Sequence, residues 1–201
     1  SALYRDYSHE AATRMSRLPF FYGWIMLPAV MLVTICTSPG QTYGISVFNP
    51  YIQQSLDLSS AELSGAYMIG TVLASLPLFW VGALMDRHGP RRVLIGVVVL
   101  FGFTCIGMRY VSGLGSLFLV FFFLRFLGQG SMSMLARNAL AMWFERRLGF
   151  ASGVSNIGMA VAVGTVPALG FALVEAYGWR GAYEVFGIGI WVLLIPLVIL
   201  I

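Results

Sequence analysis

The sequence predicts an all-α membrane protein with six transmembrane helices, arranged as two inverted three-helix repeats. Hydrophobic residues make up 59% of the 201 residues and charged residues only 10%, whereas a soluble domain carries about 25% charged residues. An outer-membrane barrel is excluded, because its strands alternate polar and apolar residues over about ten positions. About 20 apolar residues cross a bilayer core, and six stretches reach that length: Tyr22–Phe48, Ala61–Leu84, Val93–Val111, Leu114–Ala136, Phe150–Val174 and Gly181–Ile201.

The first span combines a polar face with a helix break. Four polar residues recur there at helical spacing: Thr34, Thr37, Ser38 and Gln41. Pro39-Gly40 interrupts the same region, and the carbonyl that a proline leaves free can be satisfied in a cavity but not in lipid. We therefore expect this face to line a pathway through the protein. The alternative is packing, in which the hydroxyls bond back to their own helix and Gln41 bonds to a neighbouring one.

A short, charge-dense turn connects the second and third spans. It reads Gly82-Ala83-Leu84-Met85-Asp86-Arg87-His88-Gly89-Pro90-Arg91-Arg92, and Gly89-Pro90 supplies the turn chemistry. Asp86 falls where one span ends, and Arg91 and Arg92 fall where the next begins. These charges are expected at the level of the lipid headgroups.

The fourth span contains one charged residue, Arg125, eleven residues after Leu114. At about 1.5 Å per residue it lies about 16 Å deep, near mid-membrane. An arginine there costs about 2.5–3.5 kcal/mol even on a permissive scale, so it should face protein or a water-filled cavity. It is either a cationic anchor for an anionic substrate, or a charge that modulates proton coupling, or a structural tie to polar groups of neighbouring helices. Together with Gln129, Gln41 and Thr37 it brings hydrogen-bond donors to the middle and outer half of the membrane.

The fifth span contains glycines that favour helix packing, and a repeated motif lies between the fifth and sixth spans. Glycines along the fifth span favour close helix packing over a binding role. Between these spans, Glu175–Arg180 repeats the acid-x-x-Gly-x-Arg pattern of Asp86–Arg91, 89 residues later. The two copies fall on opposite sides of the membrane, which predicts two triplets of inverted topology. Such repeats commonly place a binding site near the midplane.

Arginines set the predicted orientation, because the chain contains no lysine. Nine arginines fall on one side: Arg5, Arg14, Arg17, Arg87, Arg91, Arg92, Arg137, Arg146 and Arg147. Two, Arg109 and Arg180, fall on the other. The positive-inside rule therefore predicts an integral protein of the inner or plasma membrane with a cytoplasmic N-terminal segment, residues 1–20. The net charge of +4 then reflects topology, with no nucleic-acid partner. Cys36 and Cys105 lie inside spans and predict neither a disulfide nor a metal site.

The turn pattern G-x-L-x-D-R-x-G-x-R-R closely resembles the signature between the second and third helices of major facilitator superfamily transporters. Trp143–Gly153 with Asn156-Ile157-Gly158, and Gly178–Tyr183, resemble motifs of the monocarboxylate and oxalate/formate carriers in that superfamily. The resemblance implies half of a twelve-helix fold, so that residues 21–201 form the N-terminal six-helix bundle and the C-terminal half is missing. The alternative is a natural six-helix protein that forms a homodimer.

The resemblance also implies roles for particular residues. Asp86 would meet Arg137 or another basic residue and hold one conformation of a carrier. The gating motif then comprises Gly82, Asp86, Arg87, Gly89, Arg91, Arg92 and Arg137. The fourth-helix stretch Arg125–Gly130 resembles a superfamily motif, and the expected substrate-binding residues are Arg125, Gln129, Gln41 and Thr37.

The expected function is secondary transport by alternating access, not enzymatic catalysis. The sequence lacks a Walker motif for ATP and a nucleophile–base constellation, and no cofactor is expected. A small organic anion, such as a mono- or dicarboxylate, would move by proton symport or by exchange. The alternatives are a facilitator-family exporter of neutral or cationic compounds, and a non-transporting membrane scaffold or sensor with the same fold.

Overall fold

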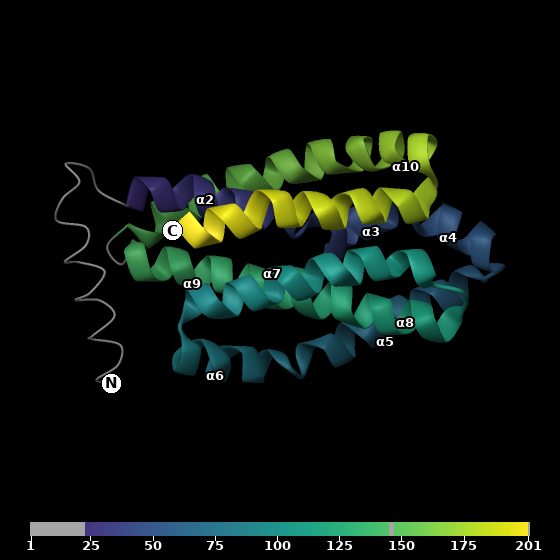
Figure 1. Cartoon of the computed structure of the whole chain (residues 1–201), viewed down its shortest axis with the longest axis horizontal. Coiled ribbons are helices and arrows are strands. Elements are labelled where there is room, and N and C mark those ends of the chain that lie inside the picture. Colours follow the sequence, from purple (N-terminus) through teal and green to yellow (C-terminus); the bar gives the residue numbers. More distant parts are fainter. Residues whose placement is uncertain (1–22, 145–146, 201) are drawn as a thin grey trace.

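The computed structural model describes residues 23–144 and 147–200, and each regular element in these ranges is a helix (Figure 1). The predicted N-terminal segment, residues 1–20, and the pair Glu145-Arg146 lie outside the described residues. In chain order the elements are α2 Gly23–Cys36, η1 Ser38–Gly40, α3 Thr42–Ser46, α4 Asn49–Leu56, α5 Ser60–Ser75, α6 Leu78–His88, α7 Pro90–Gly107, η2 Met108–Tyr110, α8 Leu114–Phe123, η3 Leu124–Met132, α9 Ser133–Trp143 and α10 Leu148–Leu200.

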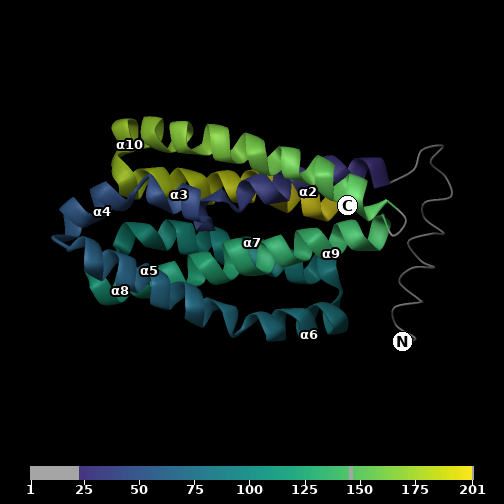
Figure 2. The same ribbon diagram turned by 180° about the vertical axis from the view of Figure 1, so that it is seen from behind.

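The long helices run side by side along one axis, and the front and back views agree on this arrangement (Figures 1 and 2). α10 packs mainly on α7 and α2, while α5 packs on α8 and α2 packs on α9. Four helical stretches of the described residues are long and apolar enough to cross a membrane: Ser60–His88, Pro90–Tyr110, Leu114–Trp143 and Leu148–Ile199.

The predicted first span is broken into pieces. α2 ends at Cys36, a 3₁₀ turn covers Ser38–Gly40, and α3 resumes at Thr42. The break falls at Pro39-Gly40 as the sequence predicted. A Cβ added at Gly40 would lie 3.0 Å from the Cα of Gly128, so the absence of a side chain lets the turn approach η3 closely. The break is therefore both a local proline effect and a site of tight helix contact.

The second pass is bent where α5 ends and α6 begins. Pro77 precedes α6, and the amide of Leu76 donates to the carbonyl of Leu73 at 3.2 Å, three residues back. A proline lacks the amide that would continue the ladder, so it bends the helix. A capping box between Ser59 and Glu62 starts α5, satisfying amides that a helix start leaves free.

Two glycines with the same unusual backbone conformation turn the chain at opposite ends of the bundle. Gly89 has φ 80° and ψ 154°, and Gly178 has φ 71° and ψ 168°. Gly89 joins α6 to α7, and α10 folds back at Gly178, at the other end (Figures 1 and 2). This region of backbone space is open to glycine almost alone. The two copies of the acid-x-x-Gly-x-Arg pattern thus share a backbone shape as well as a sequence.

Several predicted helix boundaries were wrong, although by only a few residues at the second and third spans. α6 continues to His88 and α7 starts at Pro90, which leaves Gly89 as the entire connection. The fourth pass continues to Trp143, so Arg137 lies within α9 and not in a loop. Its middle part, η3, is a π-helix that the sequence analysis did not predict. π-Helical segments occur mostly within α-helices and often at functional sites.

Candidate binding site around Arg125

The π-helical segment η3 carries Arg125, of whose surface only 6% is exposed. Its guanidinium reaches polar groups on two other segments. Nε donates to Thr71 Oγ1 at 3.0 Å, and Nη1 donates to the carbonyl of Gly40 at 3.1 Å and to Thr42 Oγ1 at 3.4 Å. The ring centroid of Tyr67 lies 4.9 Å from the guanidinium carbon, within cation–π range. Arg125 therefore joins the fourth pass to the break in the first and to α5.

Three of the residues that contact Arg125 were not predicted from the sequence: Thr42, Tyr67 and Thr71. Together with Arg125 they form a polar cluster. Tyr67 and Thr71 stand four residues apart on α5, and the hydroxyls of Tyr67 and Thr42 are 2.8 Å apart. A signal was available in the sequence, because four polar residues follow helical spacing through the second span: Ser64, Tyr67, Thr71 and Ser75. Tyr67 and Thr71 are half-buried and Thr42 is exposed, so the cluster reaches the surface of the described bundle.

The hydrogen bonds above engage two of the three nitrogens of the Arg125 guanidinium. An arginine has five N–H donors, and the Nε hydrogen and Nη1 are engaged by the three contacts above. None of these three hydrogen bonds uses Nη2, and the guanidinium also lies against the ring of Tyr67. Arginine can hold a carboxylate through two parallel N–H groups. The internal contacts of Arg125 already use one nitrogen of each such pair.

The charge of Arg125 has no acidic partner in residues 23–144 and 147–200. The ion pair formed there joins Arg109 to Glu184 at 2.5 Å, and the contacts of Arg125 are a carbonyl and two hydroxyls. The described acidic residues lie in loops or near helix ends: Asp57, Glu62, Asp86, Glu175 and Glu184. A buried cation surrounded only by neutral acceptors attracts an anion.

The polar residues of the first span are used within the protein in this conformation. Thr37 Oγ1 donates to the carbonyl of Thr34 at 2.7 Å, and Ser38 Oγ donates to that of Ile35 at 2.5 Å. Gln41 Nε2 donates to Thr37 Oγ1 at 3.1 Å and to Ser133 Oγ at 3.4 Å. These contacts correspond to the packing alternative for the stripe. Thr37 and Gln41 lie beside the break that Arg125 contacts, but they do not themselves contact the guanidinium.

Gln129 lies on the same helical face as Arg125. Arg125, Gln129 and Ser133 follow one another at intervals of four residues, which places their side chains in one row along the fourth pass. The first member of the row contacts Gly40 and the last contacts Gln41. The carbonyl oxygen of the Gln129 side chain, between them, is buried without a hydrogen-bond partner. Of the predicted binding residues, Arg125 contacts Gly40 and Gln41 contacts Thr37, whereas no hydrogen bond among the described residues joins Gln129 to any of them.

The predicted gating residues lie at one end of the bundle, where α6, α7 and α9 meet. Asp86 and Arg137 are both exposed, and no ion pair joins these two described side chains in this conformation. Their neighbours do touch, because Asn138 Nδ2 donates to the sulfur of Met85 at 3.6 Å. A Cβ at Gly82 would lie 3.3 Å from the end of Met134. The absence of a side chain at Gly82 therefore allows α6 and α9 to lie close together.

The remaining gating residues occupy the turn beside this contact. Arg87 lies in the last turn of α6, Gly89 forms the connection, and Arg91 and Arg92 lie in the first turn of α7. All three arginines are exposed. Arg91 Nη2 donates to the backbone carbonyl of Ile199 near the end of α10.

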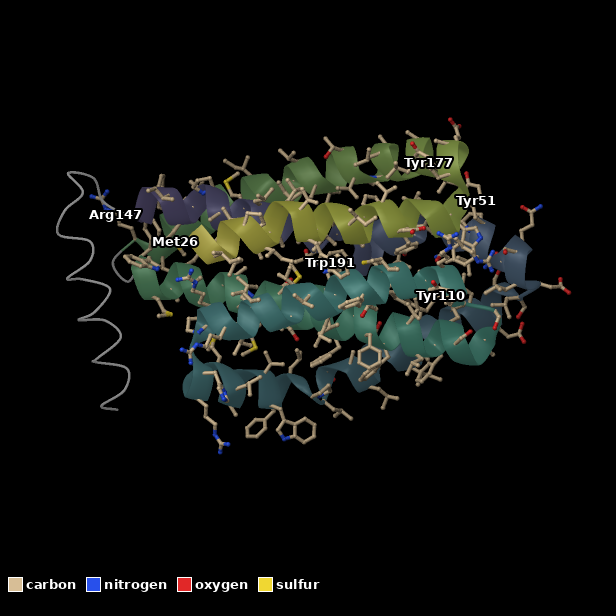
Figure 3. The ribbon with its side chains drawn as sticks, in the orientation of Figure 1. Met26, Tyr51, Tyr110, Arg147, Tyr177 and Trp191 are labelled. Carbon is tan, nitrogen blue, oxygen red and sulfur yellow. The ribbon has the colours of Figure 1, made fainter. Side chains whose placement is uncertain are left out.

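The opposite end of the bundle carries the second copy of the turn motif. Arg180 Nη2 donates to the carbonyl of Val111 at 3.0 Å, and Arg180 Nη1 donates to Ser55 Oγ at 3.1 Å. In Figure 3, Tyr51, Tyr110 and Tyr177 are labelled at this end, far from Arg147 at the other. Trp191 lies between the ends and donates to the carbonyl of Val99 at 3.2 Å. Each turn arginine therefore contacts the far end of the helical stretch that begins at the other turn. Arg91 contacts the end of α10, and Arg180 contacts Val111, just after η2.

Metal ligands are not grouped in residues 23–144 and 147–200, where no three His, Cys, Asp or Glu side chains come together. The chemistry available at the site is hydrogen bonding and charge attraction. The bundle and the site define a class: a helical membrane protein with an uncompensated cation buried between its helices.

Comparison with known proteins identifies the family. The profile of the Major Facilitator Superfamily matches residues 30–201, and the chain belongs to this superfamily. Monocarboxylate transporter 3 of Rattus norvegicus is 30% identical over 174 residues, which cover 83% of this chain and 34% of the relative. The oxalate:formate antiporter of Oxalobacter formigenes is 28% identical over 180 residues, or 88% of this chain and 42% of the relative. A probable L-galactonate transporter of Escherichia coli (strain K12) is 28% identical over 152 residues, 72% of this chain and 32% of the relative.

The family, these relatives and the long apolar helices indicate an integral membrane protein. The resemblance to the monocarboxylate and oxalate/formate branch is thereby confirmed. The chain spans 34% to 42% of the length of the first two relatives.

Proposed function

We propose that this chain is part of a secondary carrier that moves a small organic anion, with Arg125 as the cationic anchor. The observation that supports this most directly is the environment of Arg125. Its buried guanidinium contacts only neutral groups: two threonine hydroxyls, a backbone carbonyl and the ring of Tyr67. A bound carboxylate would supply the missing negative charge and a charge-assisted hydrogen bond. A cation would be repelled at the same position, which disfavours an exporter of cationic compounds.

Alternating access would expose Arg125 to each side of the membrane in turn. Two inverted triplets, with turns at Gly89 and Gly178, would place Arg125 near the interface of the repeats. The matching backbone of the two glycines and their positions at opposite ends support this assignment. In such carriers, bundles rock around a midplane site. The complete site would include residues from a second bundle, either a C-terminal half or a second copy of this chain.

The arginine-rich end of the bundle would face the cytoplasm. It carries Arg87, Arg91, Arg92, Arg137 and Arg147, while the opposite end carries Arg109 and Arg180. This distribution follows the positive-inside rule, and exposed Tyr110 and Tyr177 suit the other interface. At the cytoplasmic end, Asp86 and Arg137 would pair in one conformational state and separate in another. Contact between Met85 and Asn138 brings their helices close enough for this.

Uptake into liposomes tests the proposal. The complete protein should take up a radiolabelled monocarboxylate in a saturable way, and excess unlabelled monocarboxylate should compete with it. Arg125→Gln should abolish this uptake, whereas Arg147→Gln, at an exposed position, should retain it. Saturable transport of a cation with no response to carboxylates would contradict the proposal. The absence of any flux from well-folded protein would instead favour the scaffold alternative.

A further inference from the structure

Three hydroxyl groups belong to the polar cluster around Arg125, those of Thr42, Tyr67 and Thr71. Thr71 Oγ1 accepts from Arg125 Nε at 3.0 Å and donates its own proton to the carbonyl of Tyr67 at 2.8 Å. Thr42 Oγ1 accepts from Arg125 Nη1 at 3.4 Å and lies 2.8 Å from the hydroxyl oxygen of Tyr67. A hydroxyl carries one proton and can accept two hydrogen bonds, whereas arginine only donates. The protons of Thr42 and Tyr67 therefore go to partners other than Arg125.

The hydrogen bond between Thr42 and Tyr67 uses only one of the two hydroxyl protons. If Thr42 donates, the proton of Tyr67 remains, and if Tyr67 donates, the proton of Thr42 remains. Neither hydroxyl donates to another acceptor among the residues that the structure describes. Thr42 is exposed and Tyr67 is half-buried. In either arrangement the pair thus holds one unused O–H donor at the surface of the described bundle.

The unused donor lies beside the buried cation, whichever residue carries it. The two hydroxyl oxygens are only 2.8 Å apart, so the donor changes position little between the two arrangements. Thr42 Oγ1 touches Arg125 Nη1, and the ring centroid of Tyr67 is 4.9 Å from the guanidinium carbon. An O–H group next to a cation favours an anionic acceptor, because a hydrogen bond to a charged group is stronger than one to a neutral group.

We propose that the hydroxyl pair of Thr42 and Tyr67 gives the transported anion one hydrogen bond, which either hydroxyl can donate. The inference rests on the proposed anion carrier and adds two residues to its site. Loss of one hydroxyl frees the proton of the other, so a donor remains. Loss of both hydroxyls removes the donor. The effects of the two losses are therefore not additive, as expected for residues in one hydrogen-bond network.

Binding of radiolabelled propanoate to the complete purified protein tests this inference in a double-mutant cycle. Tyr67→Phe removes the hydroxyl and keeps the ring, which contacts Arg125 and Phe121. Thr42→Val removes the other hydroxyl and keeps the shape of the side chain. Each single variant should raise the Kd about twofold, because the remaining hydroxyl has to shift toward the anion. The combined variant should raise the Kd about twentyfold, the effect of one hydrogen bond to a charged group, against about fourfold for independent effects.

Matched variants control for structural damage. Tyr67→Phe combined with Thr42→Ser keeps one hydroxyl and should bind propanoate as Tyr67→Phe alone does. Tyr110→Phe combined with Thr104→Val makes the same two changes outside the site and should leave the Kd unchanged. Tyr110 is exposed, and Thr104 donates to the carbonyl of Leu100 in its own helix. Thermal unfolding checks each variant, and Thr42→Ala replaces Thr42→Val if the combined variant fails to fold.

The outcomes separate this inference from the proposed function. Independent losses that multiply in the combined variant would overturn the shared donor, because each hydroxyl would then act by itself. A full loss in either single variant would assign the donor to that residue and overturn the inference as well. Unchanged binding in the combined variant would show that the pair does not contact the anion. These three results leave the anion carrier intact, whereas a wild-type protein that binds no propanoate would count against the proposed function and the inference together.

Discussion

Nη1 of Arg125 donates a hydrogen bond to the backbone carbonyl of Gly40, 3.1 Å away and 85 residues earlier in the chain. Gly40 ends the 3₁₀ turn, and the hydrogen-bond ladder of α3 starts at the next carbonyl, that of Gln41. Gly40 would otherwise keep an unsatisfied carbonyl inside the bundle. Arg125 therefore closes the break in the first pass with one nitrogen, and we propose that the same guanidinium also binds the substrate.

This double use predicts different outcomes for two replacements of Arg125. Arg125→Gln removes the charge and should abolish anion binding. Arg125→Lys keeps a point charge but loses the planar fork, so binding should persist in weakened form. Both should lower thermal stability, because hydrogen bonds to a charged group contribute about 1.5–3 kcal/mol. Isothermal titration calorimetry of the purified protein measures anion affinity, and thermal unfolding measures stability. Unchanged anion affinity in a well-folded Arg125→Gln variant would exclude the anchoring role.

Gly128→Ala should disturb the contact that supports the site. An added Cβ would lie 2.7 Å from the ring of Phe101 and 3.1 Å from the Cα of Gly40. Overpacking of this kind costs about 1–3 kcal/mol, so we expect a lower melting temperature and weaker substrate binding. Gly164→Ala is the matched control, because nothing lies within 4 Å of its added Cβ. Equal melting temperatures for the two variants would show that the approach of η3 to the break is not tight.

Gly89→Ala and Gly178→Ala should each destabilise the protein by about 1–3 kcal/mol through backbone strain. Neither added Cβ meets another atom within 4 Å, so steric contact contributes nothing. Gly113→Ala is the control, since Gly113 also has open space around it but an extended backbone with φ −173°. Chemical unfolding of the three variants measures the difference. Similar stabilities for Gly89→Ala and Gly113→Ala would rule out a conformational requirement at the turn.

Asp86→Asn should shift the balance between inward-open and outward-open states, if Asp86 and Arg137 pair in one of them. The change removes the charge and keeps the shape of the side chain. Because an exposed ion pair contributes only about 0–1 kcal/mol to stability, the transport rate should change more than the stability. Glu175→Gln, at the corresponding acid of the second turn, is the control. State-selective labelling of cysteines introduced at the two ends measures the balance. An unchanged balance and transport rate in Asp86→Asn would remove the gating role.

The polar residues around Arg125 were predicted from the sequence only in part. The depth of Arg125 followed from counting residues along an apolar span, and its burial is confirmed. Thr42, Tyr67 and Thr71 were missed, although the spacing of polar residues in the second span could have indicated the last two. Thr37 and Ser38 were expected on a pathway, but their hydroxyls bond back to carbonyls three residues earlier. Sequence spacing shows which residues share a face, and it does not show which way a hydroxyl rotates.

The sequence by itself determined the features that depend on neighbouring residues. Apolar length located the four helical stretches that are long enough to cross a membrane, although the predicted six-span division is not confirmed. Pro39-Gly40 located the break, and the two glycine motifs located turns that only glycine adopts easily. Each of these follows from local hydrophobicity or local backbone geometry. The tertiary structure decided which groups surround Arg125, because Gly40 and Thr71 stand 85 and 54 residues away from it. The π-helical form of η3 and its close approach to Gly40 and Phe101 likewise appeared only in the tertiary structure. Such contacts depend on how each helix rotates about its axis and packs on its neighbours, and that is settled by all the helices together.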